Sequence, residues 1–241
     1  MGEGADGVAV RAAASAQVFV EDPTTPVLGP GDLHHLATVL RLRRDEEVVA
    51  SNGQGAWCLC RFRGPGSTER DALESDGHLR TEAREGHPVV VAFAPVKGDR
   101  PEWVVQKLTE LGVDRIVALV ADRSVVRWEG ERAVRSMARL GRTAVEAAAQ
   151  SRRVWLPELP APHRLREAAA AFPGLALAER GGAAPAASLS GLAVGPEGGW
   201  SPEERALGLE TVGLGQNVLR AETAAVAAGV VLCVTRAARR S

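Results

Sequence analysis

Two glycine-bearing segments late in the sequence have the residue types of a binding site. Residues 195–200 read Gly-Pro-Glu-Gly-Gly-Trp, and Gly215 follows twenty positions after Gly195. Each segment comes after a short apolar run and before a predicted helix. Glycine lets the backbone approach a ligand closely, and loops at one edge of an α/β sheet commonly hold small polar cofactors. The pattern predicts a cofactor site built largely from backbone groups.

The predicted cofactor-binding residues come from both segments. They are Val194, Gly195, Pro196, Glu197, Gly198 and Gly199 in the first, and Leu214, Gly215, Gln216, Val218 and Leu219 in the second. A phosphate-binding P-loop is excluded because no Gly-Lys-Ser/Thr sequence occurs there, and the spacing of a dinucleotide-binding fingerprint is absent too. The alternative for the first segment alone is a tight turn that leads into a helix.

Three charged side chains in these segments have types suited to catalysis. Arg220 carries a planar guanidinium that can hold a polarised oxygen or a phosphate. Glu222 and Glu197 could accept a proton, and Glu222 could instead orient Arg220. The alternative is an ion pair at the start of a helix, worth about 0–1 kcal/mol if exposed. Arg220, Glu222 and Glu197 are therefore the catalytic candidates.

Basic residues form two further patches. His34, Arg41 and Arg43 lie on or beside a helix predicted over residues 32–41, which is typical of a surface that contacts RNA, although ordinary exposed charge on a helix is the alternative. A second basic face, on the helix predicted over residues 129–150, carries Arg132, Arg135, Arg139 and Arg142. That face could follow a phosphate backbone, but an ordinary solvated helix face would have the same composition.

The predicted secondary structure that positions these residues differs before and after residue 86. Upstream, the sequence predicts strands over residues 17–20, 46–51 and 56–62, with a hairpin turn at residues 52–55. Downstream, apolar strands alternate with amphipathic helices, which predicts a mostly parallel sheet with helices on both faces. We therefore expect a small β domain over residues 1–86, with residues 1–16 flexible, and an α/β domain over residues 87–241.

Composition narrows the class of protein. With 241 residues, 45% of them hydrophobic, the chain can bury a sizeable core, and its net charge of −1 gives no overall attraction to nucleic acid. The lack of a run of eighteen apolar residues and of a signal peptide predicts a cytoplasmic protein that makes no contact with a membrane. Three cysteines without metal-ligand spacing predict neither disulfides nor a metal site.

Several ordered motifs resemble the bacterial RsmE family, SPOUT-superfamily methyltransferases that modify N3 of a uridine in 16S (small-subunit) ribosomal RNA. The matching motifs are the glycine segment 195–199, Leu-Arg-x-Glu-Thr-Ala at 219–224, His-His-x-x-x-Val-Leu-Arg at 34–41, the segment 97–112, Arg-Ser at 123–124, Glu146, and Gln-Ser-x-Arg at 150–153. Together they extend over nearly the whole chain.

The resemblance implies features that composition and periodicity do not reveal. The first domain would be a PUA-like β-barrel, and residues 191–236 would form a trefoil knot in which S-adenosylmethionine binds. The protein would be a homodimer that acts on 16S ribosomal RNA in the 30S subunit. Lys97, Arg123 and Arg153 lie in the matching motifs and are expected to contact RNA, and Trp200 is a candidate clamp for the target base.

The sequence also departs from the family pattern. Gln216 and Asn217 stand where the family usually has Pro-Arg, Ala149 replaces a frequent Glu, and Gln17-Val18 replaces Arg-Phe. An alternative function therefore stays open, a non-catalytic RNA-binding or ribosome-assembly protein that keeps the fold. Binding of the cofactor separates the two, because an assembly factor need not retain it.

Overall fold

The computed structural model describes residues 3–84 and 86–239, which form two compact units. The first unit comprises the chain up to Arg84 together with Ala148–Leu156, and the second comprises the remainder. The sequence analysis placed residues 148–156 in the second domain. They belong with the first because Val154 is buried beside Trp57 and its carbonyl accepts a hydrogen bond of 3.0 Å from the Gly55 amide.

The first unit is built on a five-stranded sheet. Its strands are β1 (Ala16–Phe19), β2 (Glu47–Ser51), β3 (Ala56–Phe62), β4 (Leu73–Ser75) and β5 (Arg80–Thr81). β1 pairs with β2 in parallel, and the remaining pairs are antiparallel. The predicted hairpin at residues 52–55 is confirmed, with Gly53 and Gly55 at φ +72° and +88°, a region that favours glycine.

The expectation of a flexible start was wrong for the described residues. Residues 1–2 lie outside them, but Glu3–Ala13 forms helix α1 and Ala14 is buried. Tertiary contacts hold the end of the helix. The Arg11 guanidinium lies 2.9 Å from the Glu82 carboxylate and 5.5 Å from the centre of the Trp57 ring. An Ala- and Gly-rich segment has no apolar periodicity strong enough to predict this.

The helix predicted over residues 32–41 is shorter and starts earlier. α2 (Pro30–His34) has Gly29 as its N-cap, and it continues as a π-helical turn, η1 (His35–Val39). Pro30 begins the helix because its fixed φ suits the first helical position. The side chain of Asp32 reaches back and accepts a hydrogen bond of 3.4 Å from the Gly29 amide.

The second unit contains the predicted parallel sheet. Its strands are β6 (Val90–Phe93), β7 (Arg115–Ala118), β8 (Leu175–Ala183), β9 (Gly191–Val194) and β10 (Thr211–Val212). They lie in the order β10-β8-β9-β6-β7, and every pair is parallel. β8 begins with the apolar residues 175–178 and extends into a polar segment that ends at Ala183.

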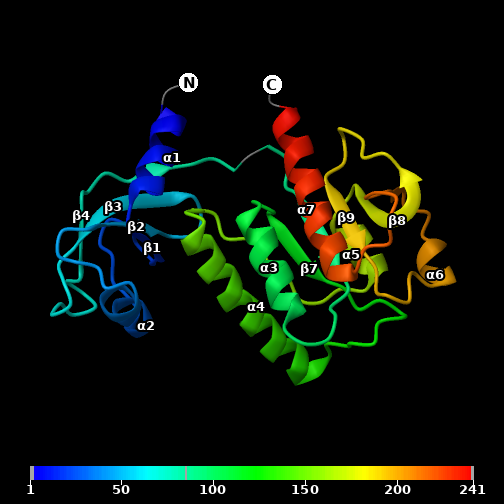
Figure 1. Cartoon of the computed structure of the whole chain (residues 1–241), viewed down its shortest axis with the longest axis horizontal. Coiled ribbons are helices and arrows are strands. Elements are labelled where there is room, and N and C mark those ends of the chain that lie inside the picture. The colour runs from blue at the N-terminus through cyan, green and yellow to red at the C-terminus, as the bar shows by residue number, and fades with distance from the viewer. Residues whose placement is uncertain (1–2, 85, 240–241) are drawn as a thin grey trace. The chain divides into compact units, whose positions relative to one another are not determined.

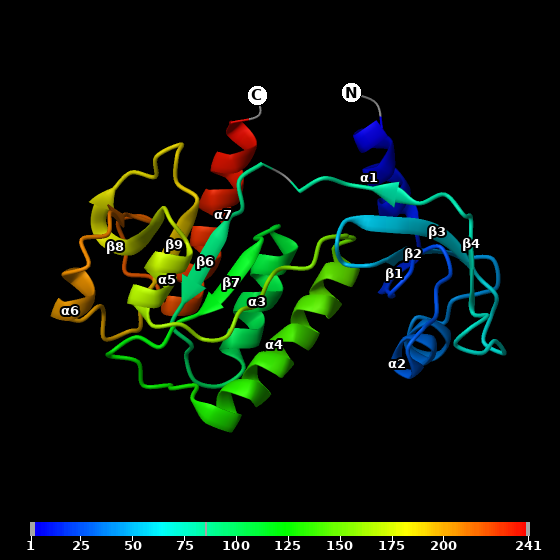
Figure 2. The ribbon, with the colours of Figure 1, turned by 180° about the vertical axis from the view of Figure 1, so that it is seen from behind.

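Helices cover both faces of this sheet, as predicted (Figures 1 and 2). They are α3 (Arg100–Glu110), α4 (Gly130–Gln150), α5 (Leu165–Ala171), α6 (Pro202–Arg205) and α7 (Ala221–Ala238). α3, α4 and α7 pack on the face that carries Val91 and Phe93, and α5 packs on the face that carries Val90 and Ala92. Alternate strand residues thus enter opposite layers, as the pleat requires.

The composition of α7 bears on the expectation that the protein makes no contact with a membrane. By length and composition alone it could cross a bilayer, with a mean hydropathy of 1.4. Within the second unit, however, Ala225, Ala228 and Leu232 of α7 are buried against α3 and the sheet. The buried share of α7 is 28%, and other apolar residues of the helix, such as Val230 and Val234, are exposed. The trefoil knot expected over residues 191–236 stays a prediction.

Candidate active site

A cavity of about 440 Å³ lies at the carboxyl end of β9, beside the start of α7. Three segments form its walls: the loop after β9, the loop before α7, and the middle of β8. All the predicted cofactor residues line this cavity except Gly198 and Gln216. Further residues that were not predicted to bind the cofactor also line the cavity, namely Ala178, Glu179 and Arg180 of β8, together with Trp200, Asn217, Ala221 and Ala224.

The glycines leave space at the cavity wall where side chains would fill it. Gly199 and Gly215 have φ of +70° and +139°, and a Cβ atom built on either would have no other heavy atom within 4 Å. Gly195 is different, since its Cβ would lie 2.9 Å from Cε2 of Trp200. The absence of side chains at these positions therefore keeps the backbone open to a ligand.

A hydrogen-bonded turn and a capping box hold the first glycine loop. The Gly199 amide donates to the Pro196 carbonyl at 2.8 Å. The Ser201 hydroxyl accepts from the Glu204 amide at 3.1 Å, while the Glu204 carboxylate accepts from the Ser201 amide at 2.8 Å. These two hydrogen bonds form a capping box at the start of α6. Because these groups are buried, they fix the path of the loop.

The same network ties the loop to the segment after β7. The Ser201 hydroxyl donates to the Asp122 carboxylate at 2.6 Å, and the other carboxylate oxygen of Glu204 accepts from the Asp122 amide at 3.0 Å. Arg123, predicted to contact RNA, donates from Nη1 to the carbonyl of Gly198 at 3.2 Å. Gly198 thus faces Arg123 rather than the cavity.

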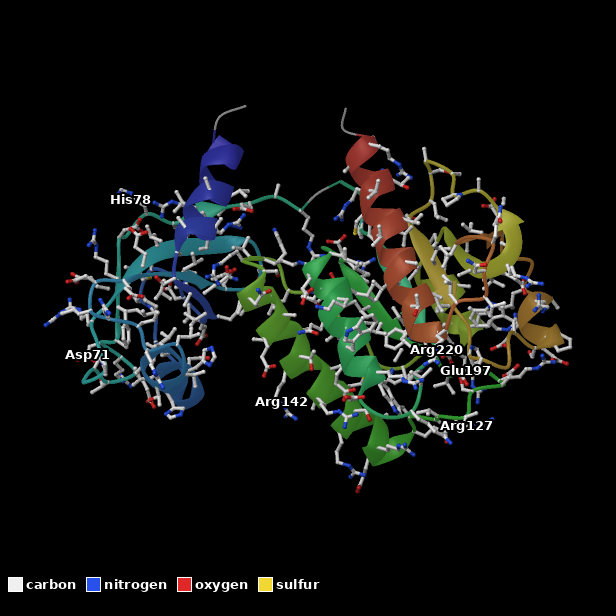
Figure 3. All side chains as sticks on the ribbon, in the orientation of Figure 1. Asp71, His78, Arg127, Arg142, Glu197 and Arg220 are labelled. Carbon is white, nitrogen blue, oxygen red and sulfur yellow. The ribbon has the colours of Figure 1, made fainter. Side chains whose placement is uncertain are left out.

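Arg220 and Glu197 both line the cavity. Figure 3 shows them close to the start of α7, where Arg220 is the N-cap residue. Both side chains are exposed to solvent and could reach a substrate. Glu179, on β8, is a second carboxylate of the lining, and it is paired with Arg205 of α6 at 2.5 Å. The polar end of β8 gave no sequence signal for this residue.

Glu222 does not lie on the cavity, so the structure does not support a proton-accepting role for it. Its side chain is 13% exposed and lies 3.6 Å from the guanidinium of Arg100 on α3. Its Oε2 atom is buried without a hydrogen-bond partner among the described residues. A carboxylate in this position orients α7 against α3.

Trp200 and Gln216 also differ from their predicted roles. Trp200 is only 2% exposed and packs in the core on the α5 face of the sheet, so its ring cannot clamp an RNA base. It instead forms part of the cavity wall behind Gly195. Gln216 lines a neighbouring depression with Arg180 and Gly213.

The predicted RNA-contacting residues lie on the surface of their units. In the first unit, the side chains of His34, Arg41 and Arg43 are exposed. Arg41 follows η1 with φ +56°, an unusual conformation for a residue with a side chain. The side chain of Arg153 is partly exposed, and its carbonyl accepts from Nε2 of Gln17 at 2.8 Å. These placements leave the RNA-binding assignments as predictions.

Lys97 is exposed on the loop after β6 in the second unit. Among the described residues, no group of three or more His, Cys, Asp or Glu side chains is placed to hold a metal ion. The polar groups that line the cavity are the Arg220 and Arg180 guanidinium groups, the Glu197 and Glu179 carboxylates, the Asn217 amide and the glycine-loop backbone.

Comparisons with known proteins agree with this architecture. Residues 83–232 match the family described as RNA methyltransferase domain, and residues 28–68 match the RNA methyltransferase PUA domain. A Mycobacterium tuberculosis protein named ribosomal RNA small subunit methyltransferase E is 37% identical over 224 residues, which cover 83% of each chain. A Bacillus subtilis protein of the same name is 29% identical over 63% of this chain and 58% of its own length.

Solved structures are similar as well. A ribosomal RNA small subunit methyltransferase E from Neisseria gonorrhoeae, bound to S-adenosylmethionine, is 26% identical with a TM-score of 0.75, over 90% of this chain and 96% of that one. A putative methyltransferase from Legionella pneumophila with the same bound cofactor is 28% identical with a TM-score of 0.77, over 92% and 97%. Because the methyltransferase match alone spans more than half of the sequence, the chain belongs to this family of RNA methyltransferases.

Proposed function

We propose that the chain transfers a methyl group from S-adenosylmethionine to N3 of a uridine in 16S ribosomal RNA. The observation that carries the proposal is the cavity formed by the two glycine loops, with Arg220 and Glu197 on its wall. The names of the relatives support the RNA substrate, and the cofactor of the Neisseria and Legionella structures supports the methyl donor.

The residues present fit S-adenosylmethionine. The cavity volume of about 440 Å³ lies within the usual range of small-molecule sites. Val194, Leu214 and Leu219 offer apolar contacts for an adenine ring, while the open backbone at Gly199 and Gly215 admits the polar parts of the ligand. When bound, the cofactor supplies a methyl group activated by a sulfonium.

Arg220 would stabilise the charge that develops on the base. Uracil N3 carries a proton, and its lone pair is delocalised into two neighbouring carbonyls, so the nitrogen is a poor nucleophile until it is deprotonated. A guanidinium beside a uracil oxygen favours the anion, and such preorganised donors typically contribute about 10²–10³ in rate. The N-cap position aims Arg220 from the mouth of α7 into the cavity.

Glu197 is the carboxylate that would accept the N3 proton. It lines the cavity on a turn fixed by the Ser201 capping box, and it is exposed. Glu222 faces α3, and Glu179 is already paired with Arg205. The turn can therefore present Glu197 to a base that enters from solvent, while α7 presents Arg220 to the oxygen beside N3.

The proposal includes a cellular setting. The substrate is the RNA of the 30S subunit, the protein is cytoplasmic, and it acts as a homodimer. Val230 and Val234 lie four residues apart on α7 and are 41% and 63% exposed. An apolar pair on an outer helix face suits a second copy of the chain, and light scattering of the purified protein measures the dimer directly.

The test combines cofactor binding with product analysis. Isothermal titration measures binding of S-adenosylmethionine, and mass spectrometry of digested nucleosides detects 3-methyluridine after incubation with a 16S transcript or with small subunits reconstituted from it. Arg220→Ala should lower kcat at least about 100-fold and change the Kd for S-adenosylmethionine by less than about twofold. Arg166→Ala is the matched control, because Arg166 is an exposed residue of α5 away from the cavity.

Two results would contradict the proposal. An unchanged kcat in Arg220→Ala removes its role in catalysis. A folded protein that binds RNA but neither binds S-adenosylmethionine nor forms 3-methyluridine favours the assembly-factor function. Asn217 would then be the first residue to examine, because it lines the cavity at a position where the family usually carries a cation.

A further inference from the structure

A second cavity in the same unit is lined by positive charge. It has a volume of about 450 Å³ and lies between the loop after β6 and the first half of α4. Its charged lining residues are Lys97, Arg132, Arg135, Arg139 and Arg142, and no carboxylate is among the lining residues. We call these five residues the cationic pocket.

Only part of this charge is neutralised. Arg135 lies 3.1 Å from Glu131, and Arg139 contacts Glu102 of α3. For Lys97, Arg132 and Arg142, the structure records no ion pair with the described residues. All three side chains are exposed. Positive groups that converge on a concave surface repel one another unless an anion neutralises them, so the cationic pocket is suited to a polyanion.

The helical repeat explains why the arginines converge. Positions 132, 135, 139 and 142 are separated by three, four and three residues, which places them on one face of α4. The opposite face carries Leu140 and Ala144, which are buried against the sheet layer. The core therefore fixes the rotation of α4 and with it the direction of the arginine face.

The cationic pocket and the cofactor cavity open at the same edge of the sheet. β6 and β9 are adjacent parallel strands, with Phe93 in register with Val194. Val194 lines the cofactor cavity, and the chain reaches Lys97 of the cationic pocket four residues after Phe93. Because neighbouring strands lie about 4.8 Å apart, two loops that leave these strand ends begin side by side.

The lining favours phosphate over nucleobases. Trp128 belongs to it but is only 5% exposed, so no broad aromatic surface is available for stacking. Flexible lysine and forked arginine side chains instead match phosphate oxygens. Contacts to phosphate position a nucleic acid without reading its sequence.

We propose that the cationic pocket binds the phosphodiester backbone of the substrate RNA beside the target uridine. This inference rests on the proposed function, because the RNA is the polyanion whose base must enter the neighbouring cofactor cavity. Lys97, Arg132 and Arg142 supply the contacts, and they raise affinity for RNA without taking part in methyl transfer. An acidic protein surface is the competing occupant, and RNA is favoured by the shared sheet edge.

The test measures how RNA affinity depends on salt. Fluorescence anisotropy with a 16S fragment and with an unrelated single-stranded RNA gives Kd at several KCl concentrations for wild type, Arg132→Gln, Arg142→Gln and the double variant. Each lost phosphate contact should reduce the magnitude of the negative slope of log K against log salt by about 0.7 for single strands. The loss should be equal for both sequences, since phosphate carries no sequence information.

Matched measurements separate the pocket from the cofactor site. Arg166→Gln removes one exposed arginine elsewhere in the unit and should leave the slope unchanged. All variants should keep the wild-type melting temperature and the wild-type Kd for S-adenosylmethionine. A double variant with wild-type RNA affinity and salt slope overturns the assignment to RNA and leaves the cofactor site intact. A wild-type protein that binds RNA through these arginines but forms no 3-methyluridine retains the pocket and rejects the proposed function instead.

Discussion

Gly195→Ala tests whether the glycine loop shapes the cofactor cavity. Gly195 does not have a positive φ, so alanine adds no backbone strain at this position. The new methyl group would lie 2.9 Å from Cε2 of Trp200 and 3.2 Å from two further ring carbons. Ordinary carbon contacts begin near 3.4 Å, so the overlap is about 0.5 Å.

Trp200 has little freedom to relieve this overlap. It is 2% exposed and packed with Leu165 and Leu177 in the core. Overpacking of this kind typically costs about 1–3 kcal/mol, which we expect to appear as a lower free energy of unfolding in urea. Since Trp200 is also a wall of the cavity, a displaced ring should weaken binding of S-adenosylmethionine. A cost of about 1.4 kcal/mol in binding corresponds to a tenfold higher Kd.

A double-mutant cycle with Trp200→Phe identifies the cause. The smaller ring should accommodate the new methyl group, so the cost of Gly195→Ala should fall by at least about 0.5 kcal/mol when Trp200→Phe is already present. Isothermal titration and urea unfolding measure the two costs in parallel. Additive effects in the cycle, or a Kd unchanged in Gly195→Ala, would refute the contact between loop and ring as the determinant of cavity shape.

Other parts of the chain give predictions with signs fixed by the structure. Gly141 lies in α4 with open space around its Cβ position, so Gly141→Ala should raise the free energy of unfolding by about 0.5–1 kcal/mol. Gly229→Ala in α7 should lower the free energy of unfolding by about 1–3 kcal/mol, because the new Cβ would lie 2.6 Å from Cδ2 of Leu108. Urea titrations measure both changes, and a destabilised Gly141→Ala or a stabilised Gly229→Ala would contradict these predictions. Burial raises the pKa of the Cys60 thiol from 9.0 to about 12, so the folded state keeps the proton while the unfolded state loses it. Deprotonation of Cys60 should leave the free energy of unfolding unaffected below pH 9. Between pH 9 and 12 the free energy of unfolding should fall by up to about 1.4 kcal/mol per pH unit more in the wild type than in Cys60→Ala. Equal pH dependence of the free energy of unfolding in the two proteins would reject this account.

The sequence predicted the second unit better than the first. The alternation of apolar strands with amphipathic helices predicted its parallel sheet, and the helix predicted over residues 129–150 matches α4 to within one residue at its start, because strands and helices of a parallel sheet bury long regular faces. α1 was not predicted because its sequence lacks a strong apolar periodicity. Tertiary contacts stabilise it instead, such as the ion pair of Arg11 with Glu82.

Within the candidate site, glycine loops were predictable and strand positions were not. A turn that lacks side chains can be recognised in the sequence by its glycines, and most of the residues predicted from them line the cavity. No sequence pattern identified Ala178, Glu179 and Arg180, because they join the cavity wall only through the pairing of β8 with β9. That pairing connects residues far apart in the chain and depends on the order of strands in the sheet.

The position of Glu222 depends on how α7 packs. Arg220 is the N-cap residue and has an extended backbone, with φ −66° and ψ 153°, so it precedes the helical repeat, whereas Glu222 lies in the first turn of α7. Arg220 lines the cavity, and Glu222 lies beside Arg100 of α3 instead. In the proposed mechanism the proton acceptor therefore comes from another element, the turn after β9, which carries Glu197 on the same cavity. The two glycine loops would then each contribute one of the two opposite charges proposed to act on N3.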